Sequence, residues 1–160
     1  MDTMVPIRPA LLRPRRISLP SRPVAAAEAR RQVRAYIYAW DVPVDPPTAE
    51  LLTSELVTNA IRHEAGETVM LVLTCPWGQL RIEVHDTSPS MPVPIDAPAD
   101  AETGRGLMLV TSLSSEWGWY RTSAGKAVYF TLAFQADMAD MKDDDYRASR
   151  ANPANLRPSP

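Results

Sequence analysis

The sequence predicts a two-layer α/β (α+β) sandwich, in which three helices cover one face of a mixed, mostly antiparallel sheet. Three observations lead to this fold class. Apolar residues recur at helical spacing in two long segments, several short segments have the apolar or alternating pattern of strands, and the two kinds of segment are grouped along the chain. With 160 residues, of which 45% are hydrophobic, the chain is long enough for one domain with a substantial core.

The first half of the chain predicts a strand and two helices. Residues 15–20 have the composition of a strand, and Pro23 opens a helix over 24–40. The apolar face of this helix is marked by Val33, Tyr36, Ile37 and Trp40. Two prolines suit the first turn of a second helix, which is expected from Pro47 to residue 63 or 64 and to stop at Gly66.

The second half of the chain predicts four strands, one helix and a long loop. The expected strands are 68–75, 80–86, 116–122 and 126–134, and turns join them into two hairpins. The alternation along the second of these strands points Leu80, Ile82 and Val84 toward the core. A proline-rich loop over 87–103 then precedes a helix over 104–115. A loop of that length in a compact domain is usually functional or disordered.

Both ends of the chain differ in composition from this central part. The ends are rich in proline, charged and small polar residues. We therefore expect a flexible arm over 1–14, a folded domain over 15–135 and a disordered tail over 136–160.

The overall composition excludes several classes of protein. A net charge of −2 gives no basic field that would indicate direct contact with nucleic acid. The single cysteine, Cys75, excludes an internal disulfide framework and is expected to be a small core residue in a reducing compartment. No apolar run reaches the roughly 18–20 residues that cross a bilayer, and the N-terminus has no apolar signal region. A cytoplasmic protein without membrane contact is expected.

The stretch SELVTNAIRHEAG, residues 54–66, places polar side chains beside the apolar face of the second helix. Glu55, Asn59 and His63 are four residues apart, so they share one helical face. The pattern alone fits either a solvated stripe or a functional site.

Two later features complete a set of groups suited to a nucleotide. Asp86 closes a predicted strand, and Gly104, Arg105 and Gly106 open a predicted helix. Glycines at a helix start let backbone N–H groups approach phosphates, and a carboxylate at a strand end can accept a hydrogen bond from an exocyclic amine. On the earlier helix, an amide oxygen suits Mg²⁺, and a carboxylate one turn away suits a general base. The long loop would then act as a lid.

These motifs, in this order, resemble the GHKL-type (Bergerat-fold) ATP-binding domain shared by gyrase B, Hsp90 chaperones and histidine kinases. Within it, the chain looks most like the anti-sigma-factor serine/threonine kinase branch and its actinobacterial relatives. The segment SELVTNAIRH resembles the N-box, VHD the adenine strand, TGRGLMLV the glycine box and GKAVYFTL the last strand. The resemblance extends from about Pro23 to Phe134.

The resemblance implies ATP and Mg²⁺ as ligands and gives roles to residues of this chain. Glu55 is implied as the general base, Asn59 as the Mg²⁺ ligand and Asp86 as the partner of the adenine amino group. The other implied nucleotide contacts at the glycine box are Gly104, Arg105, Gly106 and Leu107. His63 is implied either to contact the nucleotide or to have a structural role at the helix end.

The chain departs from the family pattern at two places. The family has D-x-G-x-G after the adenine strand, whereas residues 86–90 read DTSPS, so Ser88 is expected to supply a polar contact in place of glycine. The family's Gly-Thr pair before the last strand is Gly125-Lys126 here. Lys126 cannot accept a hydrogen bond, and it either reaches a phosphate or remains a solvated charge at the turn.

The expected function is therefore that of an anti-sigma-factor-type kinase that uses Mg·ATP to phosphorylate an antagonist protein in a partner-switching system. A non-catalytic nucleotide-binding module and a simple ATPase remain as alternatives. The sequence leaves open whether a sigma factor is also bound and whether the chain forms a homodimer, as this branch often does.

Overall fold

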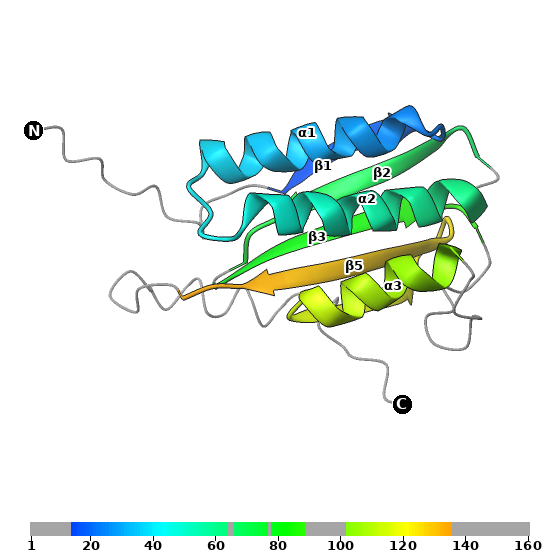
Figure 1. The fold of residues 1–160 in the computed structure, drawn as a ribbon. Coiled ribbons are helices and arrows are strands. Elements are labelled where there is room, and N and C mark those ends of the chain that lie inside the picture. Colours follow the sequence, from blue (N-terminus) through cyan, green and yellow to red (C-terminus); the bar gives the residue numbers. More distant parts are fainter. Residues whose placement is uncertain (1–13, 64–65, 77, 89–101, 136–160) are drawn as a thin grey trace, which may run out of the picture.

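The computed structural model describes residues 14–63, 66–76, 78–88 and 102–135 (Figure 1). Side chains are described for these residues except His63 and residues 102–107. The elements are β1 (Arg15–Pro20), α1 (Val24–Ala39), α2 (Pro46–His63), β2 (Thr68–Thr74), β3 (Gln79–Asp86), α3 (Glu102–Leu113), β4 (Glu116–Arg121) and β5 (Lys126–Ala133). Their kinds and order are those that the sequence predicts. The expected arm and tail lie, apart from Pro14, outside the described residues.

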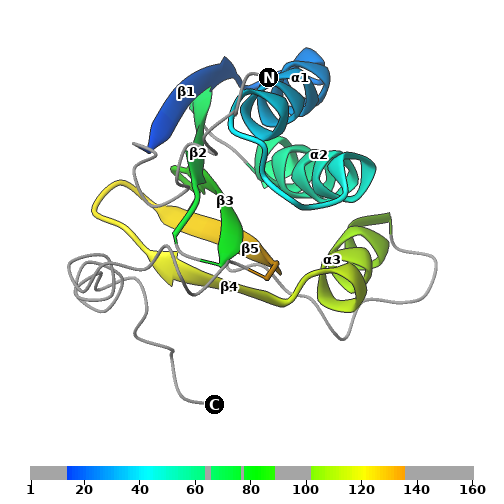
Figure 2. The ribbon, with the colours of Figure 1, turned by 90° about the vertical axis from the view of Figure 1, so that its left-hand side faces the viewer.

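The five strands form one sheet in the order β1-β2-β3-β5-β4. Figure 2 shows that all three helices lie on one side of this sheet, so the predicted two-layer sandwich is confirmed. All four strand pairings are antiparallel, which refines the expected mixed sheet to an antiparallel one. Two pairs are hairpins closed by tight turns, and Gly78 with φ of 78° supplies the left-handed residue in the first of them.

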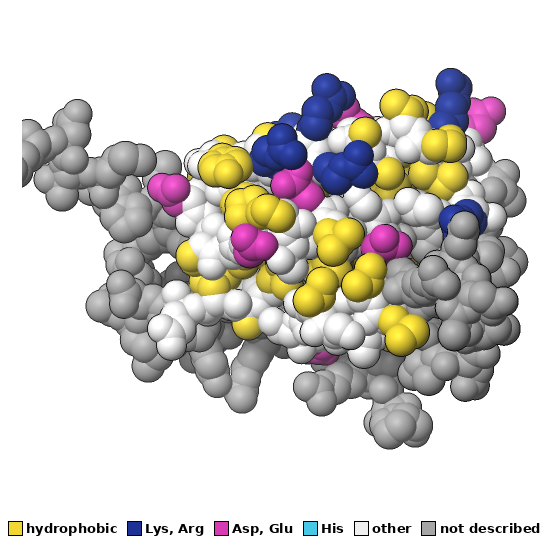
Figure 3. Space-filling view, in the orientation of Figure 1, with side chains coloured by type: hydrophobic (Ala, Val, Ile, Leu, Met, Phe, Trp, Pro, Cys, Tyr) yellow, Lys and Arg dark blue, Asp and Glu magenta, His cyan; other side chains and the backbone are white. Residues whose placement is uncertain are grey.

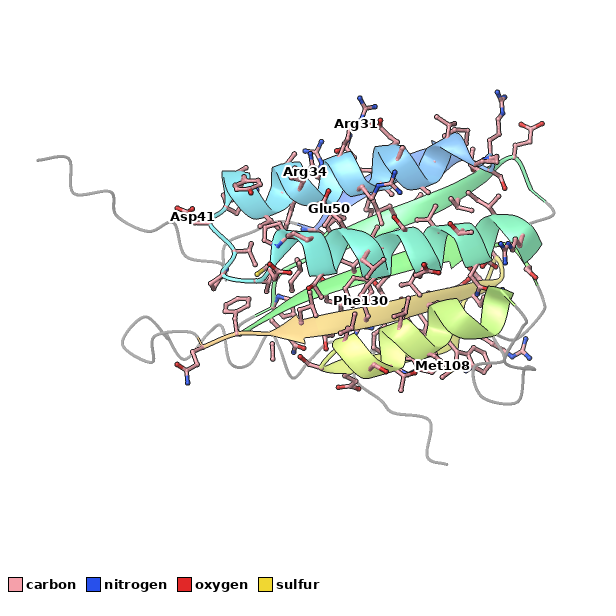
Figure 4. The ribbon with its side chains drawn as sticks, in the orientation of Figure 1. Arg31, Arg34, Asp41, Glu50, Met108 and Phe130 are labelled. Atoms are coloured by element: carbon pink, nitrogen blue, oxygen red, sulfur yellow. The ribbon has the colours of Figure 1, made fainter. Side chains whose placement is uncertain are left out.

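Alternation along the strands separates a face that the helices cover from a face that they leave free. On β3, Leu80, Ile82 and Val84 are fully buried, as predicted. Their partners on β5 have the same orientation, and Phe130 of β5 lies beneath the helices in Figure 4. Asp86 and Lys126 continue these two rows by steps of two residues. They therefore belong to the face that the helices cover.

Helix α1 packs on the sheet and on α2 through the apolar face that the sequence predicts. Val33, Tyr36 and Ile37 are buried, and Trp40 is partly buried at the C-terminal end. Polar bonds join the outer sides of the two helices: Arg34 Nε donates to Glu50 Oε1 at 3.0 Å (Figure 4).

Helix α2 begins with the chemistry expected of an N-terminus. Asp45 Oδ2 accepts a hydrogen bond from the backbone N–H of Thr48 at 3.1 Å and from its hydroxyl at 2.6 Å. Prolines 46 and 47 occupy the first turn, where their missing N–H groups cost nothing. The side that faces the sheet is built from buried residues that recur every three or four positions: Ala49, Leu52, Thr53, Leu56, Val57 and Ala60.

Two further expectations concern Cys75 and the membrane. Cys75 is buried in the core as predicted, and burial raises the pKa of its thiol to about 11. No helix within the described ranges is long and apolar enough to cross a membrane.

Candidate functional site

Four element ends meet at one end of the sandwich. Figure 1 shows the C-terminal ends of α2 and β3 together with the N-terminal ends of α3 and β5, all toward the right of that view. The strand ends are fixed by pairing, because Asp86 of β3 stands opposite Lys126 of β5. Helix α2 contacts both α3 and β3. The fold thus brings the motif of α2, the strand-end aspartate and the glycine segment of α3 to one region.

Asp86 is buried, and among the described residues only one of its two carboxylate oxygens has hydrogen-bond partners. Its Oδ1 accepts a hydrogen bond from Lys126 Nζ at 3.0 Å and another from the backbone N–H of Ser88 at 2.9 Å. Its Oδ2 is also buried but has no hydrogen-bond partner among the described residues. Buried polar atoms in native proteins are almost always paired, so this oxygen is an acceptor suited to a donor group of a ligand.

The expectation that Lys126 is a solvated charge at the turn is wrong, because its side chain is 5% exposed and its ammonium bonds the Asp86 carboxylate. The alternative expectation, a contact of Lys126 with a phosphate, remains a prediction. Strand register explains the burial of Lys126, because it sets Lys126 and Asp86 opposite each other on the face that the helices cover. The turn between β4 and β5 contributes as well, because it lies close to the chain that follows β3. A Cβ at Gly125 would lie within 2.6 Å of Thr87 Cα, so only glycine allows this close approach.

Ser88 contributes its backbone N–H to this arrangement. It is buried, and its N–H closes a turn on the Asp86 carboxylate two residues earlier. The turn holds the chain after β3 in place without the glycines of the family pattern. The expected contact of the Ser88 side chain with a nucleotide remains a prediction.

Glu55 and Asn59 lie one turn apart on α2, and both are partly buried. They flank the buried residues Leu56 and Ala60, so they stand beside the sheet-facing side of the helix. Within the described part of the chain, neither side chain makes a hydrogen bond or an ion pair. A carboxylate and an amide at helical spacing are thus available at the edge of the core, as predicted.

A comparison with protein families decides what this arrangement is. A family model described as the histidine kinase-like ATPase domain matches residues 19–132, from the end of β1 almost to the end of β5. The chain belongs to this family. The GHKL resemblance that the sequence motifs indicate is therefore confirmed.

Solved structures of low sequence identity resemble this histidine kinase-like ATPase domain. The crystal structure of the RsbU and RsbW domains of Rv1364c from Mycobacterium tuberculosis aligns with a TM-score of 0.53 and 18% identity, over 79% of this chain and 35% of that one. The catalytic domain of histidine kinase ThkA, in a nucleotide-free form, aligns with a TM-score of 0.45 and 16% identity, over 76% of this chain and 97% of that one. The first likeness shows a shared fold. A search of curated proteins found no match.

The glycine segment of this ATPase domain lies in the first turns of α3, close to the helix start that the sequence predicts. Helix α3 begins at Glu102, two residues earlier than predicted, so Gly104 and Gly106 fall in its first turns. The side chains of residues 102–107, and that of His63, lie outside the described part. The nucleotide contacts expected of Arg105 and its neighbours therefore remain predictions.

The helix-free face of the sheet carries a buried polar cluster that the sequence motifs do not indicate. We call it the Glu83 cluster; its members are Arg81, Glu83, His85, Tyr120 and Tyr129. Arg81 Nη2 lies 3.2 Å from Glu83 Oε1, and the Arg81 guanidinium stacks 3.8 Å from the centre of the Tyr129 ring. Burial opposes ionisation of the Glu83 carboxyl. His85, the Tyr120 hydroxyl and Arg81 stabilise the carboxylate and lower its pKa from 4.5 to about 2.

The outer surface of the two helices nearest the site is partly apolar. Figure 3 shows hydrophobic side chains over α2 and α3, and the exposed ones are Leu51, Met108, Leu109 and Leu113. Met108 is 62% exposed and points outward from α3 (Figure 4). Exposed apolar side chains gathered on neighbouring elements are typical of surfaces that contact other proteins.

Proposed function

We propose that this ATPase domain binds Mg·ATP between α2, α3 and the adjoining ends of β3 and β5, and transfers the γ-phosphoryl group to a serine or threonine of a partner protein. The observation that carries this proposal is the buried Oδ2 of Asp86, which has no partner among the described residues. It is an acceptor on the helix-covered face, at the end of the sandwich where α2 ends. An exocyclic amine of adenine is a donor that would satisfy it.

Asn59 is the residue of α2 that suits Mg²⁺. Its amide oxygen is a hard ligand, and Mg²⁺ usually takes few protein ligands together with phosphate oxygens and waters. No group of three or more His, Cys, Asp or Glu side chains that could hold a metal occurs in the described ranges. This donor set fits an ion that arrives with the nucleotide.

Glu55 is one helical turn from Asn59 and would act as the general base. In the proposed reaction the substrate hydroxyl loses its proton to Glu55, and its oxygen takes the γ-phosphoryl group while ADP leaves. The partly buried position of Glu55 supports this role, because a base must be reachable by the substrate and shielded from bulk water.

The exposed apolar surface of α2 and α3 supports a protein as the phosphate acceptor. Leu51 stands one turn before Glu55 on α2, so a protein that covered Leu51 would bring its own side chains near the base. The likeness to a structure that contains an RsbW domain supports an anti-sigma-factor antagonist as this acceptor protein. A sigma factor as second partner, a homodimer and a cytoplasmic location belong to the same proposal.

A second candidate function rests on the segment after Asp86. Both glycines of the family pattern are replaced, by Ser88 and Ser90, and Pro89 stands between them. This change favours a domain that binds the nucleotide for regulation without transferring phosphate. Simple ATP hydrolysis, with water in place of the protein hydroxyl, is the third candidate.

Phosphate transfer to a co-purified or candidate antagonist, followed with γ-labelled ATP, separates these functions. We expect the label in the partner with wild-type protein, and its loss by at least 100-fold in Glu55→Gln while ADP binding is unchanged. Label released only as inorganic phosphate would identify an ATPase. Nucleotide binding without either product would identify a regulatory module, and no binding of Mg·ATP would overturn the proposal.

A further inference from the structure

The ammonium group of Lys126 is a buried cation that has more hydrogen-bond donors than it has acceptors among the described residues. It carries three N–H donors, yet Asp86 Oδ1 is its one acceptor within the described ranges. Leaving donors of a buried charge unsatisfied is costly, so such groups are normally paired in full. The Lys126 side chain is 5% exposed, which leaves bulk water little access to the remaining donors.

Asp86 shows the complementary property. Both donors that reach its carboxylate, Lys126 Nζ and the Ser88 N–H, bond Oδ1, and Oδ2 is left as an acceptor without a partner among the described residues. The Asp86 side chain is 1% exposed. Counting the described residues, the pair therefore offers one acceptor and additional donors without partners, all buried on the same face of the sheet.

The surroundings prevent the pair from rearranging freely. The register of β3 and β5 sets the two residues opposite each other, and the Ser88 turn holds Oδ1. The close approach of Gly125 to the backbone of Asp86 and Thr87 fixes the turn that precedes Lys126. Asp86 Oδ2, the acceptor, and the N–H donors of Lys126 are thus held in fixed positions side by side.

We propose that Asp86 and Lys126 together recognise the edge of a 6-aminopurine. Asp86 Oδ2 accepts a hydrogen bond from the 6-amino group, and Lys126 donates one to the neighbouring ring nitrogen N1. Lys126 is then a specificity-determining residue, in addition to holding Asp86. This inference rests on the proposed binding of an adenine nucleotide.

The chemistry of purines explains why such a pair would discriminate. A 6-aminopurine presents a donor, the amino group, beside an acceptor, N1. A 6-oxopurine presents the reverse order, an acceptor at O6 beside a donor at N1. A pair with fixed order satisfies the first pattern and leaves buried groups unpaired with the second, and unpaired buried groups are what make discrimination strong.

Calorimetric titrations of the wild-type chain with modified nucleotides test the contact to N1. We expect Mg·1-deaza-ADP, which lacks N1, to bind at least 10-fold more weakly than Mg·ADP, and Mg·IDP to bind at least 100-fold more weakly. Mg·7-deaza-ADP, altered away from this edge, should bind as Mg·ADP does. These measurements need no variant, so they do not depend on how a substitution folds.

Substitution of Lys126 then assigns the contact to this side chain. Lys126→Met should bind Mg·ADP and Mg·1-deaza-ADP with equal affinity, whereas Lys126→Arg, which keeps the donors, should still prefer Mg·ADP. If the unpaired Asp86 prevents Lys126→Met from folding, the comparison of Mg·ADP with Mg·1-deaza-ADP in Lys126→Arg and in the wild-type chain still tests the contact to N1. A purely structural role would weaken both ligands alike and leave their ratio unchanged.

Two results would overturn the inference. One is equal affinity of the wild-type chain for Mg·ADP and Mg·1-deaza-ADP. The other is a preference for Mg·ADP that persists in Lys126→Met, which would assign N1 to a water or to another residue. Both are distinct from failure of the proposed function, in which the wild-type chain would bind no adenine nucleotide at all.

Discussion

The hydroxyl of Tyr120 on β4 donates a hydrogen bond to Glu83 Oε1 on β3 at 2.6 Å, although β5 lies between these two strands. Ala127 of β5 stands opposite Tyr120, and its small side chain leaves room for Tyr120 to extend toward β3. On the helix-free face, this bond joins β3 and β4 directly through side chains, although these two strands do not pair through their backbones.

Removing that hydroxyl should destabilise the domain. We expect Tyr120→Phe to lower the free energy of unfolding by about 1.5–3 kcal/mol, because hydrogen bonds to a buried charged group contribute in that range. Urea denaturation provides the measurement. Tyr38→Phe is the matched control, because Tyr38 is 68% exposed and its change should stay within about 0.5 kcal/mol. Equal losses in both variants would contradict the assignment.

The low pKa of Glu83 predicts acid sensitivity with a definite sign. Its folded-state pKa of about 2 lies below the ordinary 4.5, so its ionised form stabilises the fold above pH 5 and this contribution is lost as the pH falls toward 2. The shift corresponds to roughly 3 kcal/mol. The difference in unfolding free energy between wild type and Glu83→Gln should therefore narrow between pH 5 and pH 3. A constant difference over that range would refute this reading.

A methyl group at position 125 should disturb both stability and the nucleotide site. Its Cβ would overlap the backbone of Asp86 and Thr87, which cannot yield as a side-chain tip could. We expect Gly125→Ala to lower the free energy of unfolding by about 1–3 kcal/mol and to weaken Mg·ADP binding, as measured by thermal denaturation and calorimetry. Ser123→Ala, at an exposed position of the same turn, should change neither.

The proposed metal ligand can be tested apart from catalysis. In Asn59→Ala we expect ADP to bind with the same affinity with and without Mg²⁺, whereas Mg²⁺ should tighten binding to wild type. The reason is that the amide oxygen is the ligand that α2 supplies to the ion. Thr58→Ala, one residue away and also partly buried, serves as the control. A full Mg²⁺ effect in Asn59→Ala would remove this residue from the metal site.

The local elements of the fold were predictable because their causes are local. Alternation along β3 assigns Leu80, Ile82 and Val84 to the core, and helical spacing assigns Val33, Tyr36 and Ile37 to the buried side of α1. Proline and glycine mark most of the boundaries. The order of the motifs also identified the family, although each motif alone is weak.

The surroundings of the site were less predictable, because they depend on residues far apart in the chain. The burial of Lys126 follows from its pairing with Asp86, forty positions away, and composition near a turn instead suggests a solvated lysine. Glu83 presents the same difficulty. Its place in the alternating pattern assigns it to the helix-free face, but its hydrogen bond there comes from Tyr120, which belongs to a different hairpin.

The strand order has a consequence for how the domain folds. Strands β2 and β3 form one local hairpin and β4 and β5 another, so each can form early at a small cost in loop-closure entropy. Association of β3 with β5 requires closure of a far longer loop, and it alone brings Lys126 to Asp86. The charge pair is thus absent from either hairpin alone and is created when the two halves of the sheet dock. A competent purine site would for that reason report that the two hairpins have docked.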